Sequence, residues 1–183
     1  AANEQHCDAV LPLLEQDPCV NGKKKHNAFV TKLMPYDLDK WQREYNLTER
    51  EHCYKAVYDA VRSGLDCMHA ANYLHGDLKP DNVLFEKVGE DDCPVGIQLA
   101  DFGLSHELGK PHLKFPKDQY KWSWHEAGSV FNGAKDTFKL TKRLKINGKF
   151  KMHYIVDKRL DECSFAMLMM ELFELRVPEL QQE

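Results

Sequence analysis

The sequence lacks the patterns that would place the protein in a membrane or around a structural metal ion. No apolar run approaches the roughly 18 residues of a membrane-spanning helix, and the N-terminus has no basic-then-apolar signal pattern. The nine histidines form no HxxxH pair and no Cys/His zinc spacing. We therefore expect no membrane span and no structural zinc. The first residues, Ala1-Ala2-Asn3, resemble an internal cut rather than a native start. The sequence therefore leaves open whether a targeting segment precedes Ala1.

Short cysteine spacings are also missing. The six cysteines form no CxxC pair and lie mostly inside apolar or helical patterns, at Cys7, Cys19, Cys53, Cys67, Cys93 and Cys163. This pattern predicts buried free thiols in a reducing compartment, which favours a cytoplasmic location. One or two disulfides are the alternative if the protein is a secreted effector.

Size and charge set limits on the fold and the partners. With 183 residues the chain is long enough for one core but not for two full domains. The formal net charge of -4 gives no reason to expect nucleic acid or an anionic membrane as an obligatory partner. Size and charge alone therefore assign no function.

The chain does contain two motifs that carry chemistry. Residues 75–82 read His-Gly-Asp-Leu-Lys-Pro-Asp-Asn, and residues 101–103 read Asp-Phe-Gly. Transfer of the terminal phosphoryl group of ATP needs a carboxylate that orients the attacking hydroxyl and a lysine that neutralises charge. It also needs an amide and a second carboxylate that hold metal ions. The motifs supply these groups at the required spacing as Asp77, Lys79, Asn82 and Asp101. In this order the two motifs closely resemble the catalytic loop and the metal-binding loop of eukaryotic-type protein kinases.

The resemblance implies a fold, a reaction and two cofactors. The implied fold is α+β and protein-kinase-like, with a mostly helical C-lobe, short β-hairpins and the last strands of an N-lobe. The implied activity is ATP-dependent phosphoryl transfer to Ser/Thr hydroxyls of a protein substrate, with ATP and Mg²⁺ as cofactors. Asp77 would accept the substrate proton, and Lys79 favours Ser/Thr over Tyr specificity. Asn82 and Asp101 would bind Mg²⁺.

A second stretch resembles the nucleotide side of a kinase. Residues 28–34, Ala-Phe-Val-Thr-Lys-Leu-Met, have a strand pattern that stops before a proline. With the residues that follow, the stretch is similar to the last N-lobe strand, the hinge and the next helix of protein kinases. The resemblance implies Thr31 as the gatekeeper beside the adenine pocket and Leu84 as its apolar floor. It implies the Lys32 carbonyl and the Met34 amide as the hinge groups that bind adenine; a plain hairpin and linker is the alternative.

Turn signals and periodicity predict the elements around these motifs. Residues 6–15 predict a short strand, and Asn21-Gly22 predicts a hairpin turn. Residues 48–51, Thr-Glu-Arg-Glu, have a capping-box pattern that predicts the start of a long helix ending near Ala71. Its expected buried face consists of Val57, Val61, Leu65 and Met68.

A hairpin is expected between the two motifs. Strand patterns at 83–88 and 96–100 flank an acidic tip. Because Asn82 precedes the first strand and Asp101 follows the second, this hairpin would bring both residues to one metal site. A short strand at 73–74 is expected to lead from the long helix into the catalytic loop.

The segment after the second motif departs from the kinase pattern, since no Ala-Pro-Glu triplet follows. Ser129 follows an Ala-Gly pair that weakly resembles the start of the peptide-substrate loop, which would let Ser129 face Asp77. Residues 138–156 predict a basic hairpin around Asn147-Gly148. A three-residue loop is favoured over a two-residue turn because it groups four apolar side chains, Leu144, Ile146, Phe150 and Met152. The basic segment from Lys139 to Lys151 would be a solvated face or dock an acidic partner.

The last element is an apolar stretch at 161–175 that predicts a buried helix. It resembles the central helix of the kinase large lobe, in which Asp161 would bond the backbone of the catalytic loop. The implied domain boundary lies at the hinge. Residues 1–34 would be the remnant of an N-lobe, and residues 35–183 a C-lobe truncated after this helix.

Two further departures separate the chain from an ordinary kinase. Gly76 stands where kinases usually have the arginine that pairs with a phosphorylated activation loop, so control by such phosphorylation is not expected. There is also no Gly-x-Gly-x-x-Gly loop, no Val-Ala-Ile-Lys strand and no partner glutamate helix; either the chain begins after them or the protein lacks them. The alternative function is therefore a pseudokinase that acts as a binding scaffold or allosteric partner. Small-molecule phosphotransferases share His-Gly-Asp, but Lys79 and the Asp-Phe-Gly triplet favour the protein-kinase side.

Overall fold

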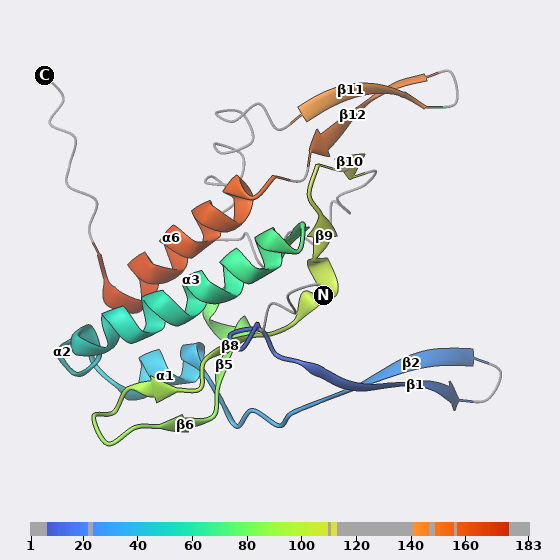
Figure 1. The fold of residues 1–183 in the computed structure, drawn as a ribbon. Coiled ribbons are helices and arrows are strands. Elements are labelled where there is room, and N and C mark those ends of the chain that lie inside the picture. Colours follow the sequence, from blue (N-terminus) through green and yellow to red (C-terminus); the bar gives the residue numbers. More distant parts are fainter. Residues whose placement is uncertain are drawn as a thin grey trace, which may run out of the picture.

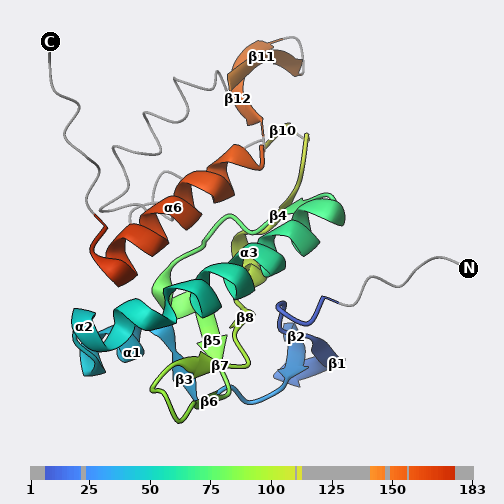
Figure 2. The ribbon, with the colours of Figure 1, turned by 60° about the vertical axis from the view of Figure 1, so that its left-hand side comes forward.

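Two long helices lie side by side over a group of short strands (Figure 1 and Figure 2). They are α3 (Tyr54–Ala70) and α6 (Arg159–Phe173), and both contribute to one hydrophobic core. The computed structural model describes residues 7–21, 24–109, 111–112, 141–146, 149–155 and 157–175. Within these residues, no helix has the length and apolar character needed to cross a membrane. The mixture of helices and short hairpins confirms the α+β prediction.

The first two strands form an antiparallel hairpin that extends away from the helices (Figure 1). They are β1 (Leu13–Asn21) and β2 (Lys24–Thr31), and Asn21 pairs with Lys24, which confirms a hairpin. Asn21 belongs to the strand rather than to the turn, and Gly22 of the predicted Asn21-Gly22 turn lies outside the described residues. The strand predicted at 6–15 is wrong in position. β1 begins directly after Pro12 and extends to Asn21, so it overlaps the predicted strand only at residues 13–15.

The next elements carry the chain from this hairpin to the core. β3 (Tyr36–Asp37) leads directly into α1 (Leu38–Glu44). Asp37 caps this helix, since its Oδ1 accepts a hydrogen bond from the Lys40 backbone N–H at 2.8 Å. Trp41 is buried on the inner side of α1 and meets the α6 residue Phe173 edge to face. The cap and the buried tryptophan fix α1 against the helical layer.

A capping box opens the next helical stretch, two residues before the predicted one at 48–51. Asn46 Oδ1 accepts from the Glu49 backbone N–H at 3.2 Å, and Glu49 Oε2 accepts from the Asn46 N–H at 2.8 Å. The box begins α2 (Leu47–Arg50), which continues through the 3-10 turn η1 (Glu51–Cys53) into α3. The prediction was wrong by two residues because the asparagine satisfies the cap before the threonine is reached.

Helix α3 buries the face that its periodicity predicts. The predicted residues are all buried: Val57, Val61, Leu65 and Met68. The helix ends at its C-cap Ala71, and β4 (Tyr73–Leu74) follows, as predicted. β4 pairs antiparallel with β9 (His106–Glu107), so the chain enters the catalytic loop from a fixed position.

The predicted hairpin between the motifs is confirmed. β5 (Val83–Phe85) and β8 (Gln98–Leu99) pair antiparallel, and β3 joins them in the order β3-β5-β8. Between them, β6 (Lys87–Val88) and β7 (Pro94–Val95) form a ribbon that carries the acidic tip. The end of the catalytic loop and the start of the Asp-Phe-Gly triplet therefore lie at neighbouring strand ends.

A second three-stranded sheet lies beyond α6 in Figure 1, in the order β10-β12-β11. Its strands are β10 (Pro111–His112), β11 (Thr141–Ile146) and β12 (Lys149–Ile155). Ile146 pairs with Lys149, so a two-residue turn joins the strands and the favoured three-residue loop is wrong. The twist of a two-residue Asn-Gly turn matches that of its strands, and this turn chemistry outweighs the grouping of apolar side chains.

Two hypotheses fall on the segment between β10 and β11. Ser129 lies outside the described residues, so its approach to Asp77 stays a prediction. Lys139 also lies outside them, and docking of an acidic partner between Lys139 and Lys151 stays a prediction as well.

Helix α6 buries one face rather than its whole circumference. The buried apolar residues are Leu160, Phe165, Leu168, Met169, Leu172 and Phe173. Ala166 and Glu171 are exposed, so the predicted buried helix is buried on one side and not on the other. Arg50 is buried at the C-terminal end of α6, where its Nη1 donates to the Leu172 carbonyl oxygen. This contact satisfies one of the backbone oxygens that a helix end leaves unpaired.

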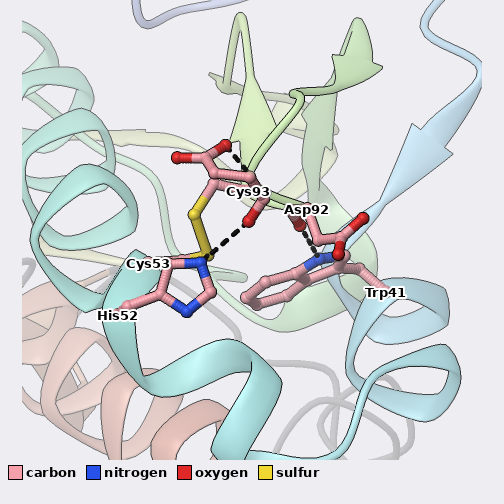
Figure 3. Close-up of a disulfide and its surroundings, with 6 residues drawn as sticks. Trp41, His52, Cys53, Asp92 and Cys93 are labelled. Atoms are coloured by element: carbon pink, nitrogen blue, oxygen red, sulfur yellow. Dashed lines mark hydrogen bonds between the residues drawn. A yellow bond between two sulfur atoms is a disulfide. The ribbon is translucent and has the colours of Figure 1, made fainter.

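Two disulfides correct the prediction of free thiols. Cys7 is joined to Cys67 and Cys53 to Cys93, with Cα–Cα distances of 5.8 and 5.4 Å, within the usual range for a disulfide. Figure 3 shows the second bond, which ties the start of α3 to the acidic hairpin. Cys163 is a free thiol, and burial raises its pKa. Because these cysteines are paired, unpaired thiols no longer support a cytoplasmic location, and the compartment stays a prediction.

Gly64 marks a close approach between α3 and two other segments. A Cβ atom at Gly64 would lie 2.8 Å from both the Ala9 carbonyl oxygen and the Leu99 side chain. We expect Gly64→Ala to lower the free energy of unfolding by about 1–3 kcal/mol through overpacking. In an uncrowded helix the same change adds up to about 1 kcal/mol. Urea unfolding measures the difference, with the exposed Ser63→Ala as the control; a stabilised Gly64→Ala protein would contradict the close approach.

Candidate active site

The catalytic loop holds three of the predicted residues in direct contact. Asp77 is almost fully buried, 7% exposed, between β4 and the 3-10 turn η2 (Pro80–Asn82). Its Oδ2 accepts hydrogen bonds from Lys79 Nζ at 3.1 Å and from Asn82 Nδ2 at 2.9 Å. Asn82 Nδ2 also donates to the Asp77 carbonyl oxygen at 2.7 Å. The loop thus fixes the carboxylate from both its side chain and its backbone.

The other carboxylate oxygen, Asp77 Oδ1, is buried and has no hydrogen-bond partner within the described part of the chain. Leaving a buried acceptor unpaired costs about 1–3 kcal/mol, so such an atom calls for an explanation. A hydroxyl donated by a substrate would satisfy it, and a carboxylate within hydrogen-bond reach of a hydroxyl can act as its general base. Oδ1 is therefore the atom through which Asp77 can orient and deprotonate a substrate.

Asp161, on the buried face of α6, anchors the loop backbone. Its Oδ2 accepts from the His75 backbone N–H at 2.8 Å, and its Oδ1 accepts from the Gly76 N–H at 3.0 Å. His69 Nε2, at the end of α3, lies 2.8 Å from the same Oδ2. The prediction that Asp161 bonds the backbone of the catalytic loop is confirmed.

The His75 ring connects the two motifs. Its Nδ1 accepts from the Asp77 backbone N–H at 3.2 Å, and its Nε2 lies 3.0 Å from the Ala100 carbonyl oxygen, which can only accept. The ring is therefore neutral with its proton on Nε2. The Phe102 ring packs edge to face on it at a centroid distance of 5.6 Å, and Ser105 Oγ donates to the His75 carbonyl oxygen at 3.0 Å.

The neutral state of His75 predicts a loss of stability in mild acid. Burial lowers its pKa below 6.5, although the charge of Asp161 opposes the shift. Between the folded and unfolded pKa values the unfolded chain binds more protons, so stability is full above about pH 6.5 and falls as pH drops towards the folded pKa. Urea unfolding at pH 7.5 and 5.5 measures this loss. We expect it to shrink in His75→Gln and to persist in His52→Gln, which alters an exposed ring; equal losses in all three proteins would contradict the assignment.

Asp101 follows β8 in a left-handed backbone conformation, with φ 58° and ψ 77°. Non-glycine residues rarely adopt it, and those that do cluster at functional sites. The exposed side chain accepts from the Gly103 N–H at 3.2 Å. The preceding residue, Ala100, donates its N–H to the Asn82 carbonyl oxygen at 2.9 Å. This backbone bond ties the loop of Asp101 to the catalytic loop.

The donor atoms of Asn82 and Asp101 fit Mg²⁺. The Asn82 amide nitrogen is committed to Asp77, so its oxygen is the atom that remains for a cation. Asp101 adds a carboxylate. Mg²⁺ prefers oxygen ligands and is commonly held by one or two carboxylates together with substrate phosphates. These two residues are therefore the ones that would hold the ion.

The chain also matches a known sequence family. The family model of the protein kinase domain matches residues 16–128, which make up more than half of the chain. The chain belongs to the protein kinase family. Mitogen-activated protein kinase 4a of Physcomitrium patens is 37% identical over 98 residues, which cover 54% of this chain and 24% of that protein. Cyclin-dependent kinase D-1 of Arabidopsis thaliana is 31% identical over 112 residues, covering 61% and 26%.

A solved structure supports the kinase fold independently. The kinase PK-1 of the Cydia pomonella granulovirus superposes with a TM-score of 0.55 at 14% identity, covering 96% of this chain and 53% of that one. This likeness shows the fold alone. The chain spans about a quarter of the length of these two curated relatives. Members of the family generally use ATP and Mg²⁺ and act on protein substrates.

The structure places the predicted nucleotide-binding residues of the kinase but does not test their roles. Thr31 ends β2, Lys32 and Met34 follow in the connection to β3, and Leu84 lies in β5. Thr31 and Lys32 are exposed, whereas Met34 and Leu84 are partly buried. The Lys32 ammonium pairs with Glu86. Adenine binding by these four residues therefore stays a prediction.

Two supporting residues of the kinase site were not predicted. His69 bonds Asp161, and Ser105 bonds the backbone of the catalytic loop. Neither lies inside a motif or at a spacing that indicates a site. Their roles become visible only when α3, α6 and the two loops are seen together.

Proposed function

We propose that the chain is the catalytic lobe of a Ser/Thr-type protein kinase, which transfers the terminal phosphoryl group of ATP to a hydroxyl of a protein substrate. The observation that carries the proposal is the buried Oδ1 of Asp77, which has no hydrogen-bond partner among the described residues and lies beside the Lys79 ammonium. A base and a cation fixed together in this way are the protein groups that phosphoryl transfer requires.

Each residue of the site has a separate role in phosphoryl transfer. Asp77 Oδ1 accepts the hydrogen bond of the substrate hydroxyl and then its proton, while Oδ2 keeps the carboxylate in place. Lys79 neutralises charge on the transferring phosphoryl group. Asn82 and Asp101 would hold Mg²⁺, which neutralises the ATP phosphates when bound. Lys79, two positions after the base, supports Ser/Thr rather than Tyr specificity.

The four nucleotide-side residues complete the proposal. Thr31 and Leu84 would flank the adenine ring, and the Lys32 carbonyl and Met34 amide would bond its edge. These roles rest on the family resemblance and on the position of each residue before or within the β3–β5 sheet.

Binding of Mg²⁺·ATP tests the proposal on the full-length protein. A nucleotide present at 100 times its dissociation constant should stabilise the protein by about 2.7 kcal/mol, which a thermal-shift titration detects. The shift should require Mg²⁺ and should be reduced in Asp101→Asn, while the exposed Asp91→Asn in the acidic tip serves as the matched control. No shift at millimolar Mg²⁺·ATP would overturn the proposal and favour a pseudokinase scaffold.

A further inference from the structure

The chain before β1 packs against the strand that leads to Asp101. We call residues 7–11 the N-terminal strap. Leu11 N–H donates to the Leu99 carbonyl oxygen and Leu99 N–H donates to the Ala9 carbonyl oxygen, both at 2.9 Å. Gln98 Nε2 donates to the Asp8 carbonyl oxygen at 2.7 Å. The strap therefore adds a short parallel pairing to the outer side of β8.

The position of β8 determines the position of the metal-binding loop. Leu99 is followed at once by Ala100 and Asp101, and Asp101 already holds a left-handed backbone. On the other side, the Ala100 backbone bonds Asn82. The Asp101 carboxylate is thus set by two supports, the catalytic loop on one side and the strap, through β8, on the other.

A disulfide fixes the strap to α3. Cys7 at the start of the strap is bonded to Cys67 near the end of the helix. The bond lines an apolar cavity of about 450 Å³, whose wall also contains Met68, Tyr73, Phe102 and Ser105. Phe102 follows Asp101 directly. The covalent bond and the metal-binding loop therefore share one cavity.

The two disulfides within the described part of the chain differ in accessibility. Cys7 is only partly buried and opens onto the cavity together with Cys67. Cys53 and Cys93 are 0% and 6% exposed, and the buried Trp41 lies nearby, where its Nε1 donates to the Asp92 carbonyl oxygen at 3.1 Å (Figure 3). Reduction requires a thiolate to reach a disulfide sulfur, so accessible bonds react first. The Cys7–Cys67 bond is the one that a small dithiol can attack.

We propose that the Cys7–Cys67 disulfide is a thiol-controlled tether that positions Asp101, and that its reduction weakens binding of Mg²⁺·nucleotide. This inference rests on the proposed kinase function. A thiolate of a dithiol attacks one sulfur, forms a mixed disulfide and releases the other cysteine. The second thiol of the reductant then displaces the first cysteine. Two electrons and two protons pass to the protein, which gains thiols at Cys7 and Cys67, while the reductant becomes a cyclic disulfide.

The experiment compares the dissociation constant of Mg²⁺·ADP for the full-length protein before and after graded reduction with dithiothreitol. If reduction leaves one tenth of the molecules able to bind nucleotide, the apparent dissociation constant of Mg²⁺·ADP rises about tenfold. We expect an increase of this order. The pair Cys7→Ser/Cys67→Ser should show the same increase and no further response to dithiothreitol. The matched pair Cys53→Ser/Cys93→Ser should bind like the oxidised wild type. Reoxidation with glutathione disulfide should restore tight binding to the wild type and to the Cys53→Ser/Cys93→Ser pair, but not to the Cys7→Ser/Cys67→Ser pair.

A second readout does not depend on nucleotide. Amide hydrogen exchange in residues 98–103 should accelerate when the Cys7–Cys67 bond is reduced, and thiol alkylation with peptide mapping should show this bond opening before Cys53–Cys93. Unchanged exchange and unchanged binding in the reduced, folded wild type would overturn the tether. These wild-type measurements also decide the question if the serine pair does not fold. If the oxidised protein binds no Mg²⁺·ADP, the proposed function fails, while the exchange measurement still tests the tether.

Discussion

Asp77→Asn is expected to reduce phosphoryl transfer by about 10²- to 10⁴-fold, the usual contribution of a positioned general base. The asparagine oxygen can take the place of Oδ2 and keep the bonds from Lys79 and Asn82. Its NH₂ group would occupy the position of Oδ1, where it cannot accept a proton. The fold should therefore persist while the chemistry is lost. Single-turnover transfer to a protein substrate, measured beside the unfolding free energy, separates the two effects.

The matched control is Asp81→Asn, four residues further along the same loop. Asp81 is exposed, so its change removes the same charge without touching the buried carboxylate. Transfer by Asp81→Asn should stay close to that of the wild type. Retained transfer in Asp77→Asn would remove Asp77 from the role of base, whatever the control shows.

Asp161→Ala is expected to lower the free energy of unfolding by about 3–5 kcal/mol, because it removes the acceptor of three donors and each unsatisfied buried donor costs about 1–3 kcal/mol. The carboxylate is 1% exposed and serves two backbone N–H groups and one imidazole. Alanine leaves these donors buried without an acceptor. Domains of this kind are stable by only about 5–15 kcal/mol, so this single change removes a large share of the total. Urea unfolding measures the loss.

Two variants on the same helix complete this test. Asp161→Asn keeps one acceptor oxygen but presents its NH₂ to a backbone donor, so it should fall between alanine and the wild type. Glu162→Ala removes the neighbouring carboxylate, which pairs with Arg62 at 2.6 Å in a partly exposed position and should cost at most about 1 kcal/mol. Equal losses from Asp161→Ala and Glu162→Ala would show that Asp161 does not anchor the loop.

The residues of the catalytic loop could be predicted because their chemistry is local. Asp77, Lys79 and Asn82 lie within one short turn, and the structure brings them into contact. The hairpin after them was predictable because strand patterns and an acidic tip mark it on both sides. The anchoring role of Asp161 was available only through the resemblance to kinases, since no spacing rule connects it to the loop.

The errors arose where distant or competing interactions decide the structure. The disulfide partners are separated by 60 and 40 residues, and such separations carry no signal in a single sequence. Asn46 took the capping role assigned to Thr48; both residues have a glutamate three positions on, so the capping-box pattern alone does not choose between them. At Ile146, turn chemistry and apolar grouping favoured different registers, and the turn chemistry decided the pairing.

The anchoring of the catalytic loop by α6 has a consequence for protein synthesis. The two N–H groups of the loop meet their acceptor in a residue 85 and 86 positions later. Contacts that close so long a stretch of chain form late in folding, because the entropy of closure must be overcome first. A ribosome releases the loop well before it releases Asp161. The nascent chain therefore carries Asp77, Lys79 and Asn82 in a loop without the support of α6, and the loop is anchored only when α6 has emerged and packed.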